Sequence, residues 1–190
     1  MPEPETLDLT GALLVAMPGM GDPRFDRSVI YMCAHSGEGA MGLIVNKPAQ
    51  DMALGDLLDQ LNIQANGPAH TATVHFGGPV ETSRGFVLHS PDYTSRLQTL
   101  DIAGQFGMTA TIDVLEDIAH GAGPKRAQIM LGYAGWGPGQ LEAEIAHNGW
   151  LTAEADPNLV FSANDDEKWL AAVKSLGIDP LGLSATAGRA

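Results

Sequence analysis

The side chains best suited to chemistry in this sequence are one cysteine and the histidines near it. Cys33 and His35 are two positions apart, so a strand over residues 28–35 would turn both toward one face. His75 and His89 each lie at the end of a further strand candidate. A thiol beside an imidazole suits nucleophilic attack or metal binding. Cys33 and His35 are therefore the candidate reactive thiol pair.

Two observations weigh against that chemistry. The sequence contains one cysteine, and its histidine spacings match no zinc-binding pattern. A lone buried cysteine usually packs as a small apolar side chain. The sequence also contains no Gly-x-Ser-x-Gly elbow and no His-Glu-x-x-His motif. We therefore expect no metal site and no cofactor, and the motifs assign no catalytic residue.

Two glycine-rich segments could bind an anion. Residues 132–139 lead from an apolar run into a helical pattern, and their backbone N–H groups could hold a phosphate. Their glycine spacing differs from the dinucleotide and phosphate-loop motifs, and a sharp strand-to-helix turn explains the glycines equally well. Residues 76–80 form a similar segment, and Arg84 beyond it could reach a carboxylate or phosphate. The alternative there is a structural loop with a salt-bridged arginine.

The elements that would position these residues mix strands with helices. Leu54, Leu57, Leu58 and Leu61 follow one helical face, and the pattern contains no strict βαβ alternation. We predict one α+β domain over residues 1–190, with a mixed sheet. The predicted strands are residues 11–17, 28–35, 41–46, 72–76, 85–89 and 128–133, with short candidates at 150–152 and 159–161; the predicted helices are 54–63, 111–119, 139–149 and one beginning at Asn164 or Asp165.

The charge balance restricts the partners. The chain has 23 acidic and 10 basic residues, for a net charge of −13, and no run of bases is longer than two. Nucleic-acid binding depends largely on neutralising phosphates, so we expect neither direct nucleic-acid binding nor a membrane partner. The single cysteine and an N-terminus without basic residues predict a cytoplasmic protein.

Several long segments resemble one family of bacterial proteins. They are residues 11–48, 75–90, 113–124 and 131–151, with a weaker match at 176–179. In this order they resemble the YqgE/AlgH family across essentially the full length. The chain ends in Gly-Arg-Ala, whereas the family pattern ends in Gly-His-Ala, so the resemblance supports no role for Arg189.

The resemblance implies a single α+β domain built from a strongly coiled sheet with flanking helices. It also implies a link to transcriptional regulation, but it brings no established molecular activity and no catalytic residues. The shared motifs fall largely in loops, which carry function more often than packing. The candidate ligand- or partner-binding residues are Asn46, Lys47, Gly77, Gly78, Arg84, Gly135, Trp136 and Gln140.

Two hypotheses follow. The first is a regulator of transcription that acts indirectly, through a protein partner or a small ligand bound at a glycine-rich surface cleft. The alternative is a small-molecule enzyme, a hydrolase or a thiol-dependent activity, that uses Cys33, His35 and Arg84.

Overall fold

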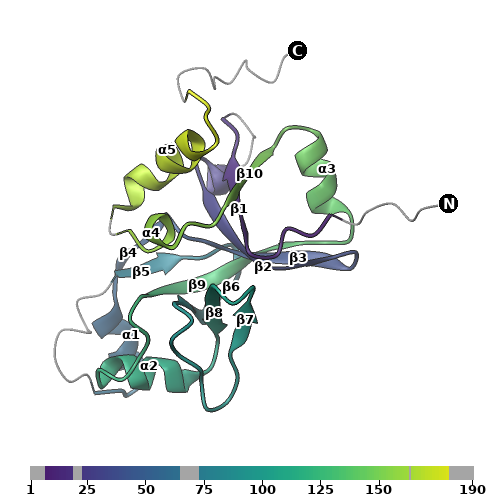
Figure 1. Cartoon of the computed structure of the whole chain (residues 1–190). Helices are drawn as coiled ribbons and strands as arrows, with labels where there is room; N and C mark the ends of the chain where they lie inside the picture. Colours follow the sequence, from purple (N-terminus) through teal and green to yellow (C-terminus); the bar gives the residue numbers. More distant parts are fainter. Residues whose placement is uncertain (1–6, 19–22, 65–72, 163, 180–190) are drawn as a thin grey trace. The chain divides into compact units, whose positions relative to one another are not determined.

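The described chain forms two compact units that are interleaved in sequence. The computed structural model describes residues 7–18, 23–64, 73–162 and 164–179 (Figure 1). The terminal unit takes its residues from 1–46 and 134–190, and the central unit takes residues 47–133. Strand β9 (Ala127–Trp136) contributes its first part to the central unit and its last three residues to the terminal unit.

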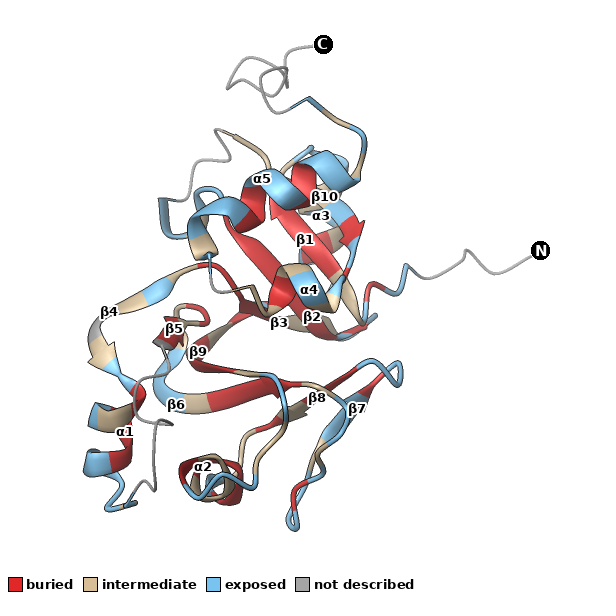
Figure 2. Cartoon of the chain, turned by 60° about the vertical axis from the view of Figure 1, so that its left-hand side comes forward, coloured by how far each residue is buried: buried red, intermediate tan, exposed pale blue. Residues whose placement is uncertain are grey.

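The terminal unit is built on antiparallel strands in the order β10-β1-β2-β3, and the end of β9 pairs with β3. The apolar runs of β1 and β2 are buried along most of their length, and α5 lies across these two strands (Figure 2). The elements are β1 (Ala12–Ala16), η1 (Pro23–Phe25), β2 (Val29–Ser36), β3 (Gly39–Ile44), α3 (Gln140–Ala146), β10 (Trp150–Glu154), α4 (Pro157–Val160) and α5 (Asp165–Ser175).

Helix α5 is fixed to the sheet by hydrogen bonds as well as by packing. Trp169 donates through Nε1 to the carbonyl oxygen of Ala16 at 2.8 Å. The buried Lys168 donates through Nζ to the carbonyl oxygen of Val45 at 2.8 Å and pairs with Asp165 at 2.8 Å. These bonds satisfy polar groups whose burial would otherwise destabilise the fold.

The central unit has β6 between β8 and β9, with β7 beside β8. Strand β5 runs parallel to β9, whereas the other pairs are antiparallel. The mixed sheet and the α+β class predicted from the sequence are therefore confirmed. The elements are β4 (Pro48–Ala53), α1 (Leu54–Gln60), β5 (Thr73–Phe76), β6 (Val80–His89), β7 (Leu100–Ile102), β8 (Phe106–Thr109) and α2 (Ile112–Ala119).

The core of the central unit lies between its two helices and its sheet. The apolar faces of α1 and α2 pack with residues from β5, β6 and β9. The spacing of three and four residues predicted such a face for α1. This core consists of Leu54, Leu57, Leu58, Val74, Val87, Val114, Leu115, Ala119 and Ile129.

Several local predictions were wrong. Residues 159–161 lie in or after helix α4 rather than in a strand, because Pro157 suits a first helical turn and Asp156 caps it, accepting from the Asn158 N–H at 2.9 Å. Strand β6 begins within the predicted loop, and β9 continues to Trp136 through half of the predicted glycine-rich turn. Strand β4 was not predicted, because its first residue, Pro48, reads as a strand terminator.

Within the described residues, no helix combines the length and the apolar character that crossing a bilayer requires.

Candidate functional site

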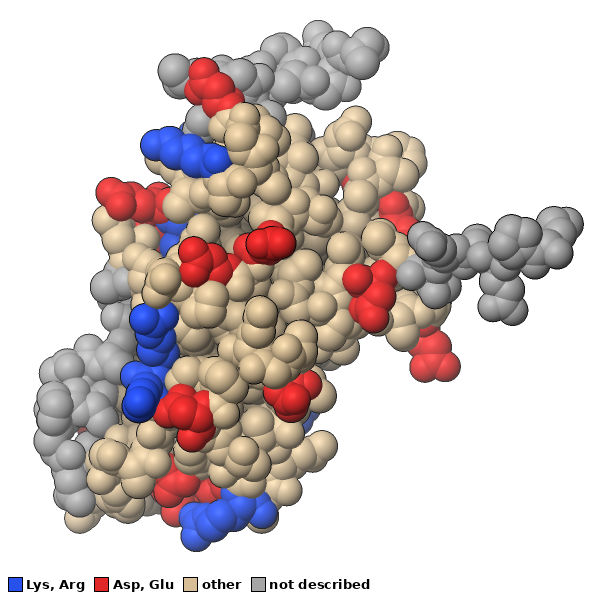
Figure 3. Space-filling view, viewed as in Figure 1, with Lys and Arg blue, Asp and Glu red and all other residues tan. Residues whose placement is uncertain are grey.

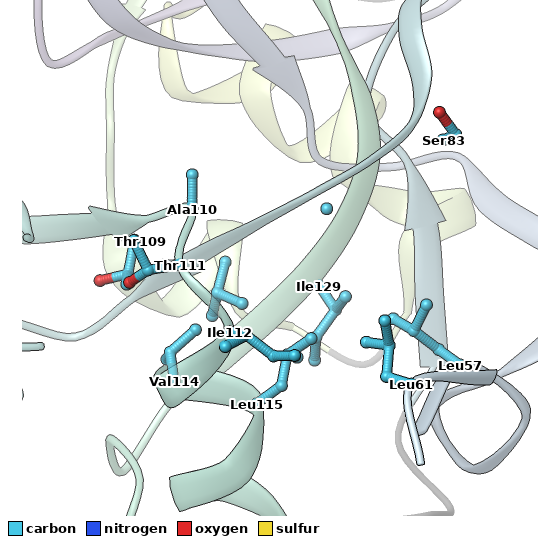
Figure 4. A pocket seen from close by; sticks show the side chains of 12 residues that line it. Leu57, Leu61, Ser83, Thr109, Ala110, Thr111, Ile112, Val114, Leu115 and Ile129 are labelled. Atoms are coloured by element: carbon cyan, nitrogen blue, oxygen red, sulfur yellow. The ribbon is translucent and has the colours of Figure 1, made fainter. Parts of the chain in front are cut away.

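The central unit contains an apolar pocket with a volume of about 160 Å³ (Figure 4). Its walls come from α1, α2, β6, β9 and the segment between β8 and α2. None of the described residues that line it carries an ionisable side chain. They are Leu57, Leu61, Ser83, Gly85, Val87, Thr109, Ala110, Thr111, Ile112, Val114, Leu115 and Ile129.

Two helices form opposite sides of the pocket. Leu57 and Leu61 are four positions apart at the end of α1, and Ile112 and Leu115 are three apart at the start of α2, so each pair lies on one helical side. Figure 4 shows Ile129 between the two pairs. Leu61 is 38% exposed and Ile112 is 46% exposed. The pocket mouth therefore presents aliphatic surface to solvent, next to an interior lined mostly by aliphatic side chains.

Strand β6 supplies the remaining wall through alternate residues. Ser83, Gly85 and Val87 share one face of the strand and all line the pocket. Val87 lies opposite Ile129 in the pairing of β6 with β9. A Cβ atom added to Gly85 would meet no other atom within 4 Å. Because Gly85 has no side chain, it leaves empty space in the pocket wall. No neighbouring atom would prevent a larger residue at this position.

A buried hydrogen-bond network holds one edge of the pocket. The His89 ring donates through Nδ1 to the carbonyl oxygen of Ser90 at 2.8 Å, so its Nε2 accepts from the Thr109 hydroxyl, also at 2.8 Å. Burial lowers the pKa of His89, which favours the neutral ring. The Thr111 hydroxyl donates to Asp113 at 2.5 Å. Both pocket threonines are thus held by the protein itself.

The predicted residues Asn46 and Gln140 lie in the terminal unit and hold local backbone. Asn46 is buried; its Oδ1 accepts from the Val29 N–H at 2.9 Å and its Nδ2 donates to the Arg27 carbonyl at 2.8 Å. The Oε1 of Gln140 accepts from the Gly137 N–H at 3.0 Å, which closes the turn before α3. These contacts give both side chains a structural role.

Gly135 and Trp136 also lie in the terminal unit, in the last part of β9. Gly135 pairs with Met41 of β3. The Trp136 ring is buried and packs edge-on against Trp150, with centroids 6.1 Å apart. Trp136 therefore belongs to the packing of the terminal unit.

Cys33 and His35, the candidate reactive pair, have separate environments. The pairing of β2 with β3 skips Cys33, which is the extra residue of a β-bulge. Burial raises the pKa of its thiol to about 12, so the thiol is protonated at neutral pH and a poor nucleophile.

His35 accepts from the Leu9 N–H at Nδ1 (3.0 Å) and donates from Nε2 to Glu142. This hydrogen bond lowers the pKa of Glu142.

Gly77, in the central unit, owes its identity to close backbone packing, and Gly78 contributes its carbonyl oxygen to the same contact. A Cβ atom on Gly77 would lie 2.3 Å from the carbonyl oxygen of Gly132, and one on Gly132 would lie 2.3 Å from that of Gly78. No larger residue fits this contact without a backbone shift. The loop that suggested a ligand site thus has a structural reason for its glycines.

Lys47 and Arg84 are the other predicted residues in the central unit. The Lys47 carbonyl oxygen accepts from the Phe76 N–H at 2.7 Å. Arg84 is exposed; its Nη1 lies 3.5 Å from Glu81 Oε2, and its guanidinium lies 5.2 Å from the centre of the Phe86 ring. An exposed ion pair of this kind stabilises a fold only weakly.

The predicted site is thus divided between the units. Lys47, Gly77, Gly78 and Arg84 belong to the central unit, and the other six residues belong to the terminal unit. The three residues of the proposed enzyme, Cys33, His35 and Arg84, are divided in the same way. Within the described residues, no group of three or more His, Cys, Asp or Glu side chains is arranged to hold a metal ion.

Sequence reasoning missed the pocket because its lining residues look like ordinary core. Leu57 and Leu61 were recognised as one helical face, but a helical face does not reveal whether its packing is complete. Gly85 offered no clear signal either, because the predicted strand began at this residue, whereas in the structure Gly85 lies inside β6.

The chain has an α+β fold, and its central unit contains an apolar pocket. A model of the AlgH-like family matches residues 13–181, and the chain belongs to that family. The family predicted from the sequence is therefore confirmed.

Its relatives match over nearly their full lengths. A UPF0301 protein of Ruegeria pomeroyi is 64% identical over 97% of this chain and 100% of the relative. A UPF0301 protein of Cereibacter sphaeroides is 57% identical over the same shares. Among solved structures, the AlgH protein from Pseudomonas aeruginosa has a TM-score of 0.78 and 43% identity, with 96% of each chain covered.

A more distant structure shares the fold alone. Protein DIP2367 from Corynebacterium diphtheriae has a TM-score of 0.71 at 22% identity, covering 95% of this chain and 92% of that chain. The fold therefore persists where most residues differ.

Proposed function

We propose that this protein is a regulatory binding protein that takes a small ligand in the pocket of the central unit. The observation that carries this proposal is the lining of the pocket, which contains aliphatic side chains and hydroxyls but no acid, base or cation among the described residues. Binding sites are concave and mostly apolar, with few polar groups. General acid–base catalysis requires a titratable group that this lining does not supply.

The ligand would act on transcription through a protein partner rather than through DNA contact. The net charge is −13. On the face shown in Figure 3, acidic side chains are scattered and basic side chains lie in small separate groups. A phosphate backbone is bound by clustered Lys and Arg, which this face does not present. Control through a protein partner is compatible with an anionic surface.

A ligand screen on the full-length protein tests this function. We expect members of a chemically mixed library to raise the melting temperature in a concentration-dependent way, because a ligand that binds only the folded state stabilises it. Mass spectrometry of the hits should recover them unchanged. Turnover of a hit would replace this function with an enzymatic one, and a library with no stabilising compound would contradict the proposal.

A separate experiment tests the proposal that the protein acts on transcription through a protein partner and not by binding DNA. Fluorescence anisotropy with labelled double-stranded promoter DNA at physiological salt should show no binding at micromolar protein, with or without a hit compound. Nanomolar binding with a steep salt dependence would contradict action through a protein partner.

A further inference from the structure

The lining of the pocket restricts the chemistry of its occupant. Its inner surface consists of side chains from Leu57, Val87, Leu115 and Ile129 with their neighbours. Among the described residues, no lining side chain offers a counter-charge to a carboxylate, phosphate or ammonium group. Moving an isolated charge into such surroundings is strongly unfavourable. An occupant of this pocket therefore enters with an uncharged, apolar part.

The volume restricts the size of that part. The pocket has a volume of about 160 Å³, and an apolar protein cavity of roughly 150 Å³ accommodates benzene, a group of six carbons. The mouth can accommodate a polar end, since Ser83 lines the pocket and is exposed. Its hydroxyl can both donate and accept a hydrogen bond.

Gly85 is the lining residue that leaves room for an occupant. It stands inside β6, opposite Leu131 of β9, where a β-branched residue would normally favour the strand. Neither a left-handed backbone nor a close neighbour requires glycine there, because an added Cβ would meet nothing within 4 Å. The pairing of β6 with β9 is irregular between Val80 and Gly85, and glycine is common at such irregularities. The missing side chain of Gly85 also enlarges the pocket.

We propose that this pocket binds a short uncharged hydrocarbon group of about six carbons, carrying a neutral polar end at the Ser83 rim, and that Gly85 sets the length limit. This assignment rests on the proposed ligand-binding function and adds the chemical class of the ligand and a specificity-determining residue. The aliphatic surface of Leu61 and Ile112 at the mouth is covered when the occupant is present.

The probes for this proposal are the straight-chain alcohols from butanol to octanol, with hexanoate and hexylamine as charged counterparts. Dissociation constants come from NMR titration of the full-length protein. Each added methylene that is buried should tighten binding about fourfold. The gain should stop at about six carbons, where the pocket is full. Neither charged probe should bind more tightly than hexanol, because no described lining residue offers a counter-charge.

The variants Gly85→Ala and Gly85→Val test the wall directly. Valine adds three carbons to the pocket, so it should lower the length limit by about three carbons and weaken hexanol binding at least about tenfold. Alanine should give a smaller shift in the same direction. Gly37→Val is the matched control, because an added Cβ at Gly37 also meets nothing within 4 Å and Gly37 lies in the terminal unit. Its hexanol affinity should equal that of the wild type.

The outcomes separate this proposal from the proposed function. If hexanoate or hexylamine binds more tightly than hexanol and loses affinity in Gly85→Val, the pocket binds ligands but the uncharged class is wrong. If hexanol affinity is the same in wild type and both Gly85 variants, the role of Gly85 is wrong. If no alcohol binds while the mixed library yields other hits, this assignment fails and the function stands. If neither yields binding, both fail.

Discussion

At the scale of single residues, Gly85 and His89 show two different uses of one strand. Both belong to β6, four positions apart. Gly85 leaves space beside the pocket, whereas His89 fills space completely: it is fully buried, and an added Cβ on Gly107 would lie 2.4 Å from its ring. His89 is also bonded at both ring nitrogens, to Ser90 and Thr109. Gly85 thus leaves part of the pocket empty, whereas His89 holds Thr109 at the edge of the pocket.

The buried His89 predicts a loss of stability in mild acid. Burial lowers its pKa below 6.5, although its bond to Ser90 and the nearby Asp92 oppose that shift. The unfolded chain therefore takes up the proton first, and the stabilising contribution is complete above about pH 6.5 and lost as pH falls toward the folded-state pKa. The slope for this group is at most about 1.4 kcal/mol per pH unit.

Urea unfolding of wild type and His89→Gln at pH 7.5 and pH 5.5 measures this effect. The variant should be less stable at pH 7.5 by about 1–3 kcal/mol, since a flexible amide does not reproduce the packing and bond directions of the rigid buried ring. The difference should shrink at pH 5.5. His120→Gln, at an exposed position, is the matched control for removing an imidazole. A difference that stays constant or grows at pH 5.5 would contradict the neutral buried ring.

At the scale of elements, close glycine packing shapes the central unit. Gly132 of β9 has a φ of +77°, and its missing Cβ allows the Gly78 carbonyl oxygen to approach. Gly77 makes the reciprocal contact with the Gly132 carbonyl oxygen. The connection between β5 and β6 therefore lies directly on the backbone of β9, which sets where β6 begins. The glycines position the pocket-lining strand without touching the pocket.

Gly132→Ala should destabilise the protein by about 2–5 kcal/mol, the sum of left-handed strain and steric overlap. Gly104→Ala separates the two causes. Gly104 has a similar φ of +70°, but an added Cβ there meets nothing within 4 Å, so it should cost only about 1–2 kcal/mol. Equal losses in urea unfolding would show that the close approach to Gly78 contributes nothing.

The elements also show how far sequence reasoning reached. Helices α1 and α5 were predicted from apolar periodicity, and α2 and α3 from the residues that start and stop them; all four lie near their predicted positions. The short apolar run at residues 159–161 was wrongly predicted as a strand, because the Asp156 cap and Pro157 outweigh the strand preference of Val160 and Phe161. The glycine motifs were found, but a sequence cannot distinguish a glycine that accommodates neighbouring backbone, such as Gly77, from one that leaves a pocket open, such as Gly85. That difference depends on long-range packing.

At the scale of the whole molecule, charge and cavity chemistry support the same interpretation. The chain has 23 acidic and 10 basic residues, which gives a net charge of −13. The pocket is lined by uncharged residues, and the one thiol is buried, with its pKa raised to about 12. A ligand recognised through apolar burial, with control passed to a protein partner, fits these properties without requiring a catalytic centre.

Methyl NMR tests the central claim, that the pocket of the central unit is the ligand site. Full-length protein labelled at Ile, Leu and Val methyl groups is titrated with hexanol. We predict saturable shift changes at Leu57, Leu115 and Ile129, and unchanged signals from Leu13 and Leu43 in the terminal unit. Saturable changes confined to the terminal unit, or no saturable change at any methyl group, would contradict the account.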